Sequence, residues 1–200
     1  MDKYFSSLVV LTIALATVIF IFYLVNSRST KRNNSNISLK SINEFNKDEL
    51  INLFAFAEGR LIPLTSVKDD VFASLSLGDG IAINPDKNVL YAPCSATVTD
   101  VAETNHAIKL ECDNNIKILL HIGIDTVNLK GRFFSVHVKE GNKVKKGDRL
   151  ISFDLVKIKY LRYDPTICMV VYGNENCELV KNVDAPHIVS RKDIILAIKK

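Results

Sequence analysis

The sequence lacks the closely spaced cysteine and histidine pairs that identify small zinc-binding domains. Its four cysteines form no C-x-x-C motif and have no neighbouring histidine pair; they are Cys94, Cys112, Cys168 and Cys177. Such spacings argue against a structural zinc site. We therefore expect four reduced thiols, in the core or on the surface, as in most proteins of a reducing compartment.

A concentrated positive surface is also missing. The 26 basic residues are nearly balanced by 22 acidic ones, and part of the net charge of +4 comes from residues 28–32 and from the final two lysines. Nucleic-acid binding would need a basic stripe or a recognisable module, so we expect no nucleic-acid partner. The 200 residues, 48% of them hydrophobic, suffice for one substantial domain and an accessory segment but not for two large domains.

One long hydrophobic run is present near the start of the chain. Residues 8–25 are apolar apart from Thr12 and Thr17, and with Ser6 and Ser7 the run reaches the roughly 20 residues that cross a bilayer. A cleaved secretory signal is the alternative, but the run is long for a signal, and no A-x-A-like site follows it. We predict a transmembrane anchor in residues 1–27, with residues 6–25 in the membrane.

The charges on either side of this run predict its orientation. Only Lys3 precedes the run, whereas Arg28, Lys31 and Arg32 follow it directly. By the positive-inside rule, the rest of the chain should lie in the cytoplasm. We thus expect a single-pass protein whose functional domain is cytoplasmic.

The segment after the anchor has a linker composition. Residues 26–40 are rich in Asn, Ser, Thr, Lys and Arg and contain almost nothing that could be buried, and we predict a cytoplasmic linker over residues 28–50. Ser41-x-x-Glu44 has the form of a helix-capping box, which makes a short helix plausible there. The helical pattern fades at residues 53–56, which could equally form a first strand. The domain should therefore begin near residue 51 and extend to residue 200.

The domain itself reads as short β segments separated by turn residues. Clusters of Gly, Pro, Asp and Asn stand between the segments. This spacing predicts an all-β fold, an antiparallel β-sandwich or barrel, with helical character only at residues 155–162. The expected strands cover residues 60–64, 80–84, 95–101, 107–112, 116–122, 133–138, 149–153, 167–172 and 194–198.

One of these strands delivers a histidine to its end. His121 closes an apolar run and is followed by Gly123 and Asp125. If residues 113–114 form a two-residue hairpin loop, His106 lies directly opposite His121, and cross-strand neighbours have Cβ atoms about 4.5–5.5 Å apart. Ile108 and Leu119 would then share that row. A loop longer or shorter by one residue would put the two histidines on opposite faces.

Two converging imidazoles favour phosphoryl transfer. A lone histidine on an apolar strand is more often a structural residue than a functional one. A pair differs, because one neutral imidazole can act as the nucleophile while the other donates a hydrogen bond to the anion. His137 and His187 have no such surroundings, and we expect them to be incidental.

Several separate motifs occur in a fixed order along the domain. Thr104-Asn105-His106-Ala107 precedes a His-x-Gly-Ile-Asp-Thr-Val-x-Leu-x-Gly motif that begins at His121; others lie at residues 71–73, 78–83, 92–93, 140–148 and 153–155. From about Gly59 to Lys200 the chain resembles the glucose-type enzyme IIA (EIIA) domain of the bacterial sugar phosphotransferase system (PTS). The resemblance implies a β-sandwich of the duplicated hybrid motif type and a phosphotransferase component, a histidine phosphocarrier.

The resemblance also implies roles for individual residues. His121 would accept the phosphoryl group from phospho-HPr and pass it to the cysteine of a sugar permease's IIB domain. His106 would stabilise the phosphate, and Thr104 would support the pair. Acidic residues would stand at the rim and apolar ones would dock the partners; the former are Asp125 and Asp69, and the latter are Phe72, Leu77, Leu119 and Val127. No metal or organic cofactor is implied for the transfer, although zinc shared with a partner's carboxylate is a possibility in this family.

Two other functions compete with the phosphocarrier. A lysostaphin-like zinc endopeptidase is suggested by the spacing from His121 to Asp125, but that class also needs an H-x-H pair, which the sequence lacks. A non-transferring EIIA-like regulator would keep the fold and use its histidine face only to bind proteins. The presence of both His106 and His121 favours the carrier.

Overall fold

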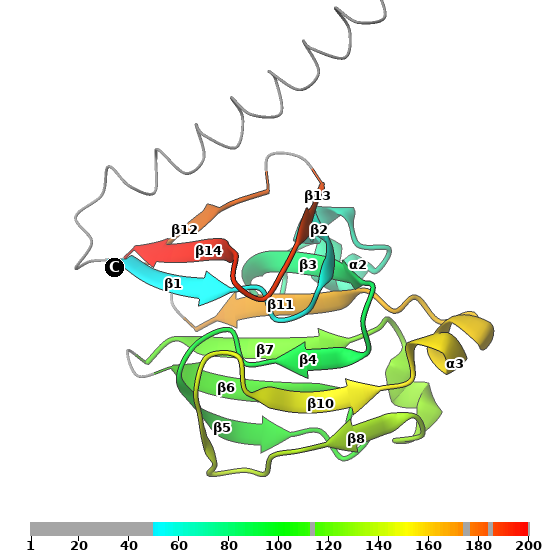
Figure 1. The fold of residues 1–200 in the computed structure, drawn as a ribbon. Helices are drawn as coiled ribbons and strands as arrows, with labels where there is room; N and C mark the ends of the chain where they lie inside the picture. Colours follow the sequence, from blue (N-terminus) through cyan, green and yellow to red (C-terminus); the bar gives the residue numbers. More distant parts are fainter. Residues whose placement is uncertain (1–49, 113–114, 174–176, 184–185, 200) are drawn as a thin grey trace, which may run out of the picture. The chain divides into compact units, whose positions relative to one another are not determined.

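A computed structural model describes residues 50–112, 115–173, 177–183 and 186–199 of the chain (Figure 1). The elements are short strands with a few single helical turns between them. In chain order they are β1 (Leu50–Phe54), β2 (Gly59–Pro63), η1 (Leu64–Ser66), α2 (Asp70–Ala73), β3 (Asp79–Pro85), β4 (Val89–Tyr91), β5 (Ala96–Val101), β6 (Ala107–Cys112), β7 (Lys117–Ile122), η2 (Thr126–Leu129), β8 (Phe134–Val136), β9 (Lys143–Val144), β10 (Arg149–Phe153), α3 (Leu155–Tyr160), β11 (Ile167–Tyr172), β12 (Glu178–Lys181), β13 (His187–Val189) and β14 (Ile194–Lys199).

The strands form three antiparallel sheets. The large sheet has the order β13-β2-β3-β11-β7-β6-β5-β9, and two three-stranded sheets have the orders β4-β10-β8 and β1-β14-β12. The prediction of an all-β antiparallel fold is confirmed. Among the described residues, no helix is long and apolar enough to cross a membrane. The predicted anchor and the capping box at Ser41 lie outside the described residues.

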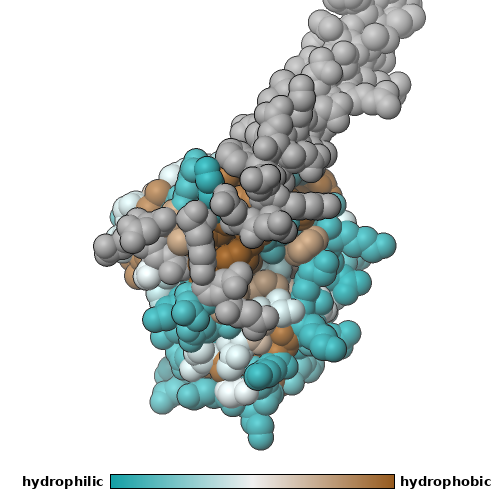
Figure 2. Space-filling view, turned by 90° about the vertical axis from the view of Figure 1, so that its left-hand side faces the viewer, coloured by the Kyte–Doolittle hydropathy of each residue, from teal (hydrophilic) through white to brown (hydrophobic). Residues whose placement is uncertain are grey.

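The sheets enclose one main hydrophobic core, to which all three contribute. Leu53 of β1, Leu90 of β4 and Leu120 of β7 belong to it, and each is fully buried. Burial of a side chain of this size contributes about 1.5–3 kcal/mol. On the side of the domain seen in Figure 2, hydrophilic residues surround smaller hydrophobic areas.

A second, smaller cluster lies on the other face of the large sheet. Along β11, Ile167, Met169 and Val171 enter the main core, whereas Cys168 and Val170 enter the second cluster. This alternation follows from the period of two in a strand. The second cluster is covered by η1 and α2, which supply Leu64 and Phe72. It forms the floor beneath the histidines.

Each predicted strand overlaps an observed one, and residues 107–112, 149–153 and 167–172 match β6, β10 and β11 to the residue. Residues 50–54 form β1, so a strand stands where the sequence allowed either the end of a helix or a first strand. The prediction did not include α2 or the short strands β4, β9, β12 and β13. These elements contain only two to four residues, too few to display a period.

The predicted register of the β6–β7 hairpin is wrong by one residue. Ala107, not His106, pairs with His121, and Cys112 pairs with Ile116 through a backbone hydrogen bond of 2.8 Å. The loop therefore includes Asn115, whose left-handed φ of 60° suits asparagine. The predicted row containing Ile108 and Leu119 is also wrong, because Ile108 faces the main core.

The prediction of four reduced cysteines is wrong for two of them. Cys94 and Cys112 form a disulfide, with Cα atoms 6.7 Å apart. The reason is the pairing of β5 with β6, in which Ala96 lies opposite Cys112. Cys94 stands two residues before Ala96, close enough to reach across. Cys168 and Cys177 are free thiols.

Candidate functional site

His121 lies next to the last residue of β7, where the chain turns sharply. The turn begins at Gly123, with φ of +73°, and a Cβ atom there would lie 2.4 Å from the Thr126 side chain. Only glycine fits without strain. The Gly123 N–H donates to the Thr166 carbonyl at 3.0 Å, which ties the turn to the segment before β11. The position of the His121 backbone is thus fixed from two sides.

His106 reaches His121 from a position just outside the ladder. β6 begins at Ala107, and Asn105 has a left-handed φ of 57°. The backbone N–H of Ile122 donates to the His106 carbonyl at 2.8 Å. The two imidazole rings lie with centroids 4.7 Å apart and planes at 87°. The structure thus brings the predicted pair together, although the register that suggested it is wrong.

The orientation of the His106 ring is fixed by Thr104. The Thr104 hydroxyl and His106 Nδ1 are 2.6 Å apart, and only 8% of His106 is exposed. When the hydroxyl donates to Nδ1, the neutral ring carries its proton on Nε2. Nε2 of His106 is then a hydrogen-bond donor.

Both histidines are neutral at physiological pH. Burial, followed by the charge of His106, lowers the pKa of His121 to about 4, against the opposing effects of the Gly123 backbone and Asp69. Burial likewise lowers the pKa of His106. The Nδ1 atom of His121 is buried. Its Nε2 is therefore the nitrogen open to a reaction partner.

An aromatic side chain covers one side of His121. The Phe72 ring lies 5.2 Å from the His121 ring, centroid to centroid, at 61°, and only 6% of Phe72 is exposed. Asp69 caps α2 by accepting hydrogen bonds from the backbone N–H groups of Val71 and Phe72, at 3.0 and 3.1 Å. A carboxylate at this position is a favourable helix cap. Asp69 thereby holds Phe72 in place.

The other residues predicted for the site occupy different environments. Leu77 and Val127 are 44% and 48% exposed, whereas Leu119 is half-buried and packs on the second cluster. Asp125 is exposed, with φ of 58°, at the start of η2. Val71, next to Phe72, is 49% exposed and was not predicted as a site residue.

Cys168 is a neighbour of His121 that the sequence analysis missed. It lies directly opposite His121 on β11 and is fully buried. Burial raises the pKa of this thiol, so it stays protonated. Its place beside His121 depends on the pairing of β7 with β11, strands far apart in the sequence, for which no local pattern gives a signal.

The described residues contain no group of three His, Cys, Asp or Glu side chains that could hold a metal ion. A catalytic zinc site needs three protein ligands. The endopeptidase alternative therefore gains no support from the described residues.

The family comparison points to sugar phosphotransfer. Residues 51–177 match the sequence model of the family described as "phosphoenolpyruvate-dependent sugar phosphotransferase system, EIIA 1". A "PTS system glucose-specific EIIA component" of Oceanobacillus iheyensis is 38% identical over 148 residues, which make up 74% of this chain and 90% of that protein. One of Buchnera aphidicola with the same name is 36% identical over 163 residues, covering 80% of this chain and 95% of that protein.

Relatives also include larger proteins and a solved structure. A "PTS system mannose-specific EIIBCA component" of Corynebacterium glutamicum is 44% identical over 128 residues, which are 63% of this chain but only 18% of that protein. The solved structure of glucose permease IIA from Mycoplasma capricolum superposes with a TM-score of 0.66 and 30% sequence identity, covering 76% of this chain and 98% of that chain.

Proposed function

The chain belongs to the EIIA 1 family of the phosphoenolpyruvate-dependent sugar phosphotransferase system, and on this premise we propose that His121 carries the phosphoryl group. The protein is a phosphocarrier and a phosphotransferase component of sugar uptake. The observation that supports His121 best is its pairing with a second imidazole, ring centroids 4.7 Å apart, in a place that keeps it neutral. A neutral imidazole has the lone pair that a nucleophile needs.

The transfer consists of two displacements at phosphorus. In the first, Nε2 of His121 attacks the phosphorus of phosphohistidine on HPr; the new N–P bond forms as the donor's N–P bond breaks, and the donor imidazole leaves with the old bonding pair. In the second, a thiolate of the permease IIB domain attacks the same phosphorus. The S–P bond forms as the N–P bond to His121 breaks, and the His121 imidazole leaves with the bonding pair. Phosphoryl transfer depends on positioning and charge stabilisation more than on acid–base chemistry.

Neighbouring residues assist without forming covalent bonds. We assign to Nε2–H of His106 the hydrogen bond to a phosphate oxygen, with Thr104 holding that ring in the correct tautomer. Asp69 positions Phe72 through the cap of α2. Asp125, exposed at the rim, is assigned to partner recognition.

The surface around His121 suits two partners that dock in turn. Its exposed apolar side chains are Val71, Leu77 and Val127, and the buried ring of Phe72 and half-buried Leu119 continue it inward. Small apolar surfaces with polar rims suit transient complexes. We assign this surface to HPr, the phosphoryl donor, and to the IIB domain of a sugar permease, the acceptor. Relatives in which EIIA is fused to EIIB and EIIC support a permease partner.

A phosphorylation assay tests the assignment of His121. The protein is incubated with HPr, its kinase and labelled phosphoenolpyruvate, and acid-labile label is measured. Wild type should be labelled and His121→Ala should not. His106→Ala should accept label but pass it poorly to a IIB domain, because it loses a donor and not the nucleophile. Label in His121→Ala would disprove the site, and failure of labelled wild type to pass its phosphate on would favour the regulatory alternative.

We also propose that residues 6–25 anchor the domain on the cytoplasmic side of the membrane. The apolar run and the cations that follow it support this orientation. A linker of residues 28–50 would keep the carrier at high effective concentration near its permease. In cells, deletion of residues 1–30 should reduce phosphoryl flux through the permease, and unchanged flux would remove the support for the tether. Protease added to sealed inverted vesicles should cleave the domain, whereas in spheroplasts it should not.

A further inference from the structure

The outer face of α3 exposes hydrophobic side chains to solvent. Ile158 of this helix is fully buried in the main core, whereas Val156 and Tyr160 are 75% and 79% exposed. These two residues are four apart and are therefore neighbours along one helix face. Leu161, the next residue, is 41% exposed. We call Val156, Tyr160 and Leu161 the α3 patch.

Positive charges stand between these hydrophobic residues. Residues 155–163 include Lys157, Lys159 and Arg162 but no Asp or Glu. The carboxylate just before them, Asp154, accepts a hydrogen bond of 2.9 Å from the Lys157 backbone, so it serves as the helix cap. The patch thus combines an apolar face with cations whose charge no acidic side chain of the same segment balances.

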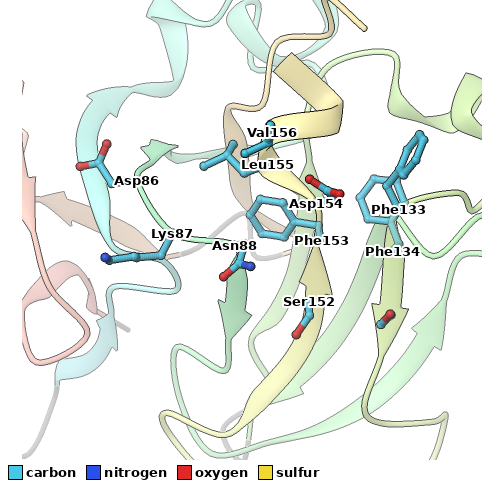
Figure 3. Close-up of a pocket in the computed structure, with 11 residues that line it drawn as sticks. Asp86, Lys87, Asn88, Phe133, Phe134, Ser152, Phe153, Asp154, Leu155 and Val156 are labelled. Carbon is cyan, nitrogen blue, oxygen red and sulfur yellow. The ribbon is translucent and has the colours of Figure 1, made fainter. Parts of the chain in front are cut away.

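A groove lined by both polar and apolar residues adjoins α3. The groove has a volume of about 640 Å³. Figure 3 shows Leu155 and Val156 at its edge, next to Phe153, with Phe133 and Phe134 on the opposite side. α3 itself lies at the rim of the domain beyond the end of β10 (Figure 1).

We propose that the α3 patch docks on an anionic lipid surface. Protruding aliphatic and aromatic side chains can enter the boundary between headgroups and acyl chains, and tyrosine is enriched there. Lysine and arginine beside them can extend to lipid phosphates, and each should strengthen binding about fivefold. The cations beside the exposed apolar side chains favour the lipid.

Docking through α3 would orient the histidine site. The chain leaves α3 through residues 162–166, and Asp164 and Thr166 accept backbone hydrogen bonds from Ile124 and Gly123, the turn directly after His121. The patch and the His121 turn are therefore linked by a few residues of fixed backbone. A membrane-bound permease domain could then meet His121 in a limited range of orientations.

The absence of tryptophan from the sequence permits a site-specific test. Full-length Tyr160→Trp is mixed with vesicles of phosphatidylcholine, or of phosphatidylcholine with phosphatidylglycerol, each with and without brominated acyl chains. In the anionic vesicles, its indole emission should shift to the blue and be quenched by bromine. Ile188→Trp, at a position 69% exposed on β13, is the matched control and should stay unquenched. Lys157→Gln in the Tyr160→Trp background should weaken binding to the anionic vesicles about fivefold.

Sedimentation of the same full-length chain with the vesicles separates this proposal from the anchor. Retention on neutral vesicles with quenching that requires phosphatidylglycerol supports both proposals. Retention without such quenching, or equal quenching of the Ile188→Trp control, overturns the α3 patch and leaves the anchor. Quenching on anionic vesicles without retention on neutral ones supports the patch and overturns the anchor. Phosphorylation of His121 depends on neither outcome.

Discussion

Phosphoryl acceptance by His121 should persist when the pH falls from 7.5 to 5.0. Burial lowers the pKa of this imidazole to about 4, so a drop in pH over that range leaves the ring largely neutral. At pH 5.0 about nine-tenths of the rings would keep their lone pair, against about 3% at the ordinary pKa of 6.5. The structure therefore predicts a rate about thirtyfold higher at pH 5.0 than an exposed histidine would give.

The substitution Phe72→Ala should make acceptance sensitive to acid. The Phe72 ring covers His121 at 5.2 Å, and burial is the largest cause of the low pKa. Its removal admits water, so the pKa should rise toward 6.5 and acceptance at pH 5.0 should fall several-fold further than in wild type. The loss of docking surface lowers the rate equally at both pH values, so it cancels in the ratio of the two rates.

Rapid mixing with isolated phospho-HPr measures the rate, with an alkaline quench that preserves phosphohistidine. The ratio of rates at pH 5.0 and 7.5 is compared between wild type and Phe72→Ala. Because both proteins use the same donor, this comparison removes the effect of pH on the donor. Histidine-ring NMR gives the pKa directly, with His121 assigned from the His121→Gln variant. A His121 midpoint near 6.5 in wild type, or equal rate ratios in the two proteins, would refute the reasoning.

Three further predictions concern the supports of the site and the domain. Gly123→Ala should lower the free energy of unfolding by about 1–3 kcal/mol in urea, more than Gly141→Ala, because both have positive φ but only Gly123 is crowded. Thr104→Val should slow transfer to the acceptor about fivefold by removing one hydrogen bond, and Thr104→Ser should restore it. Reduction of the Cys94–Cys112 disulfide, 18 residues apart, should lower the free energy of unfolding by about 3 kcal/mol.

Each of these predictions has an outcome that contradicts it. Equal losses in the two glycine variants would mean that backbone strain alone acts at Gly123. An unchanged rate in Thr104→Val would remove the assigned role of the hydroxyl. A melting temperature that dithiothreitol lowers equally in wild type and in Cys94→Ala would show that the disulfide does not stabilise the fold.

Much of the fold was predictable because its strands are bounded by clear turn residues. β10 and β11 match their predictions to the residue, since β10 lies between Asp148 and Asp154 and β11 ends just before Gly173. The order of strands in the sheets was not predictable, because β3, β11 and β7 are neighbours in space but distant in sequence. Cys168 lies beside His121 through that pairing, whereas the Cys94–Cys112 disulfide depends on the register of β5 and β6, so local patterns missed both.

The histidine pair was predicted for a reason that the structure corrects. The hairpin rule assumed a regular ladder through His106, in which a shift of one residue would separate the two rings. The register did shift, with Ala107 opposite His121. The rule fails here because the ladder ends at Ala107: Asn105, at φ of 57°, turns the chain, and Thr104 then fixes the freed ring beside His121. The approach of the two imidazoles thus depends on this turn as well as on the pairing of β6 with β7, which brings the His106 carbonyl to the Ile122 N–H.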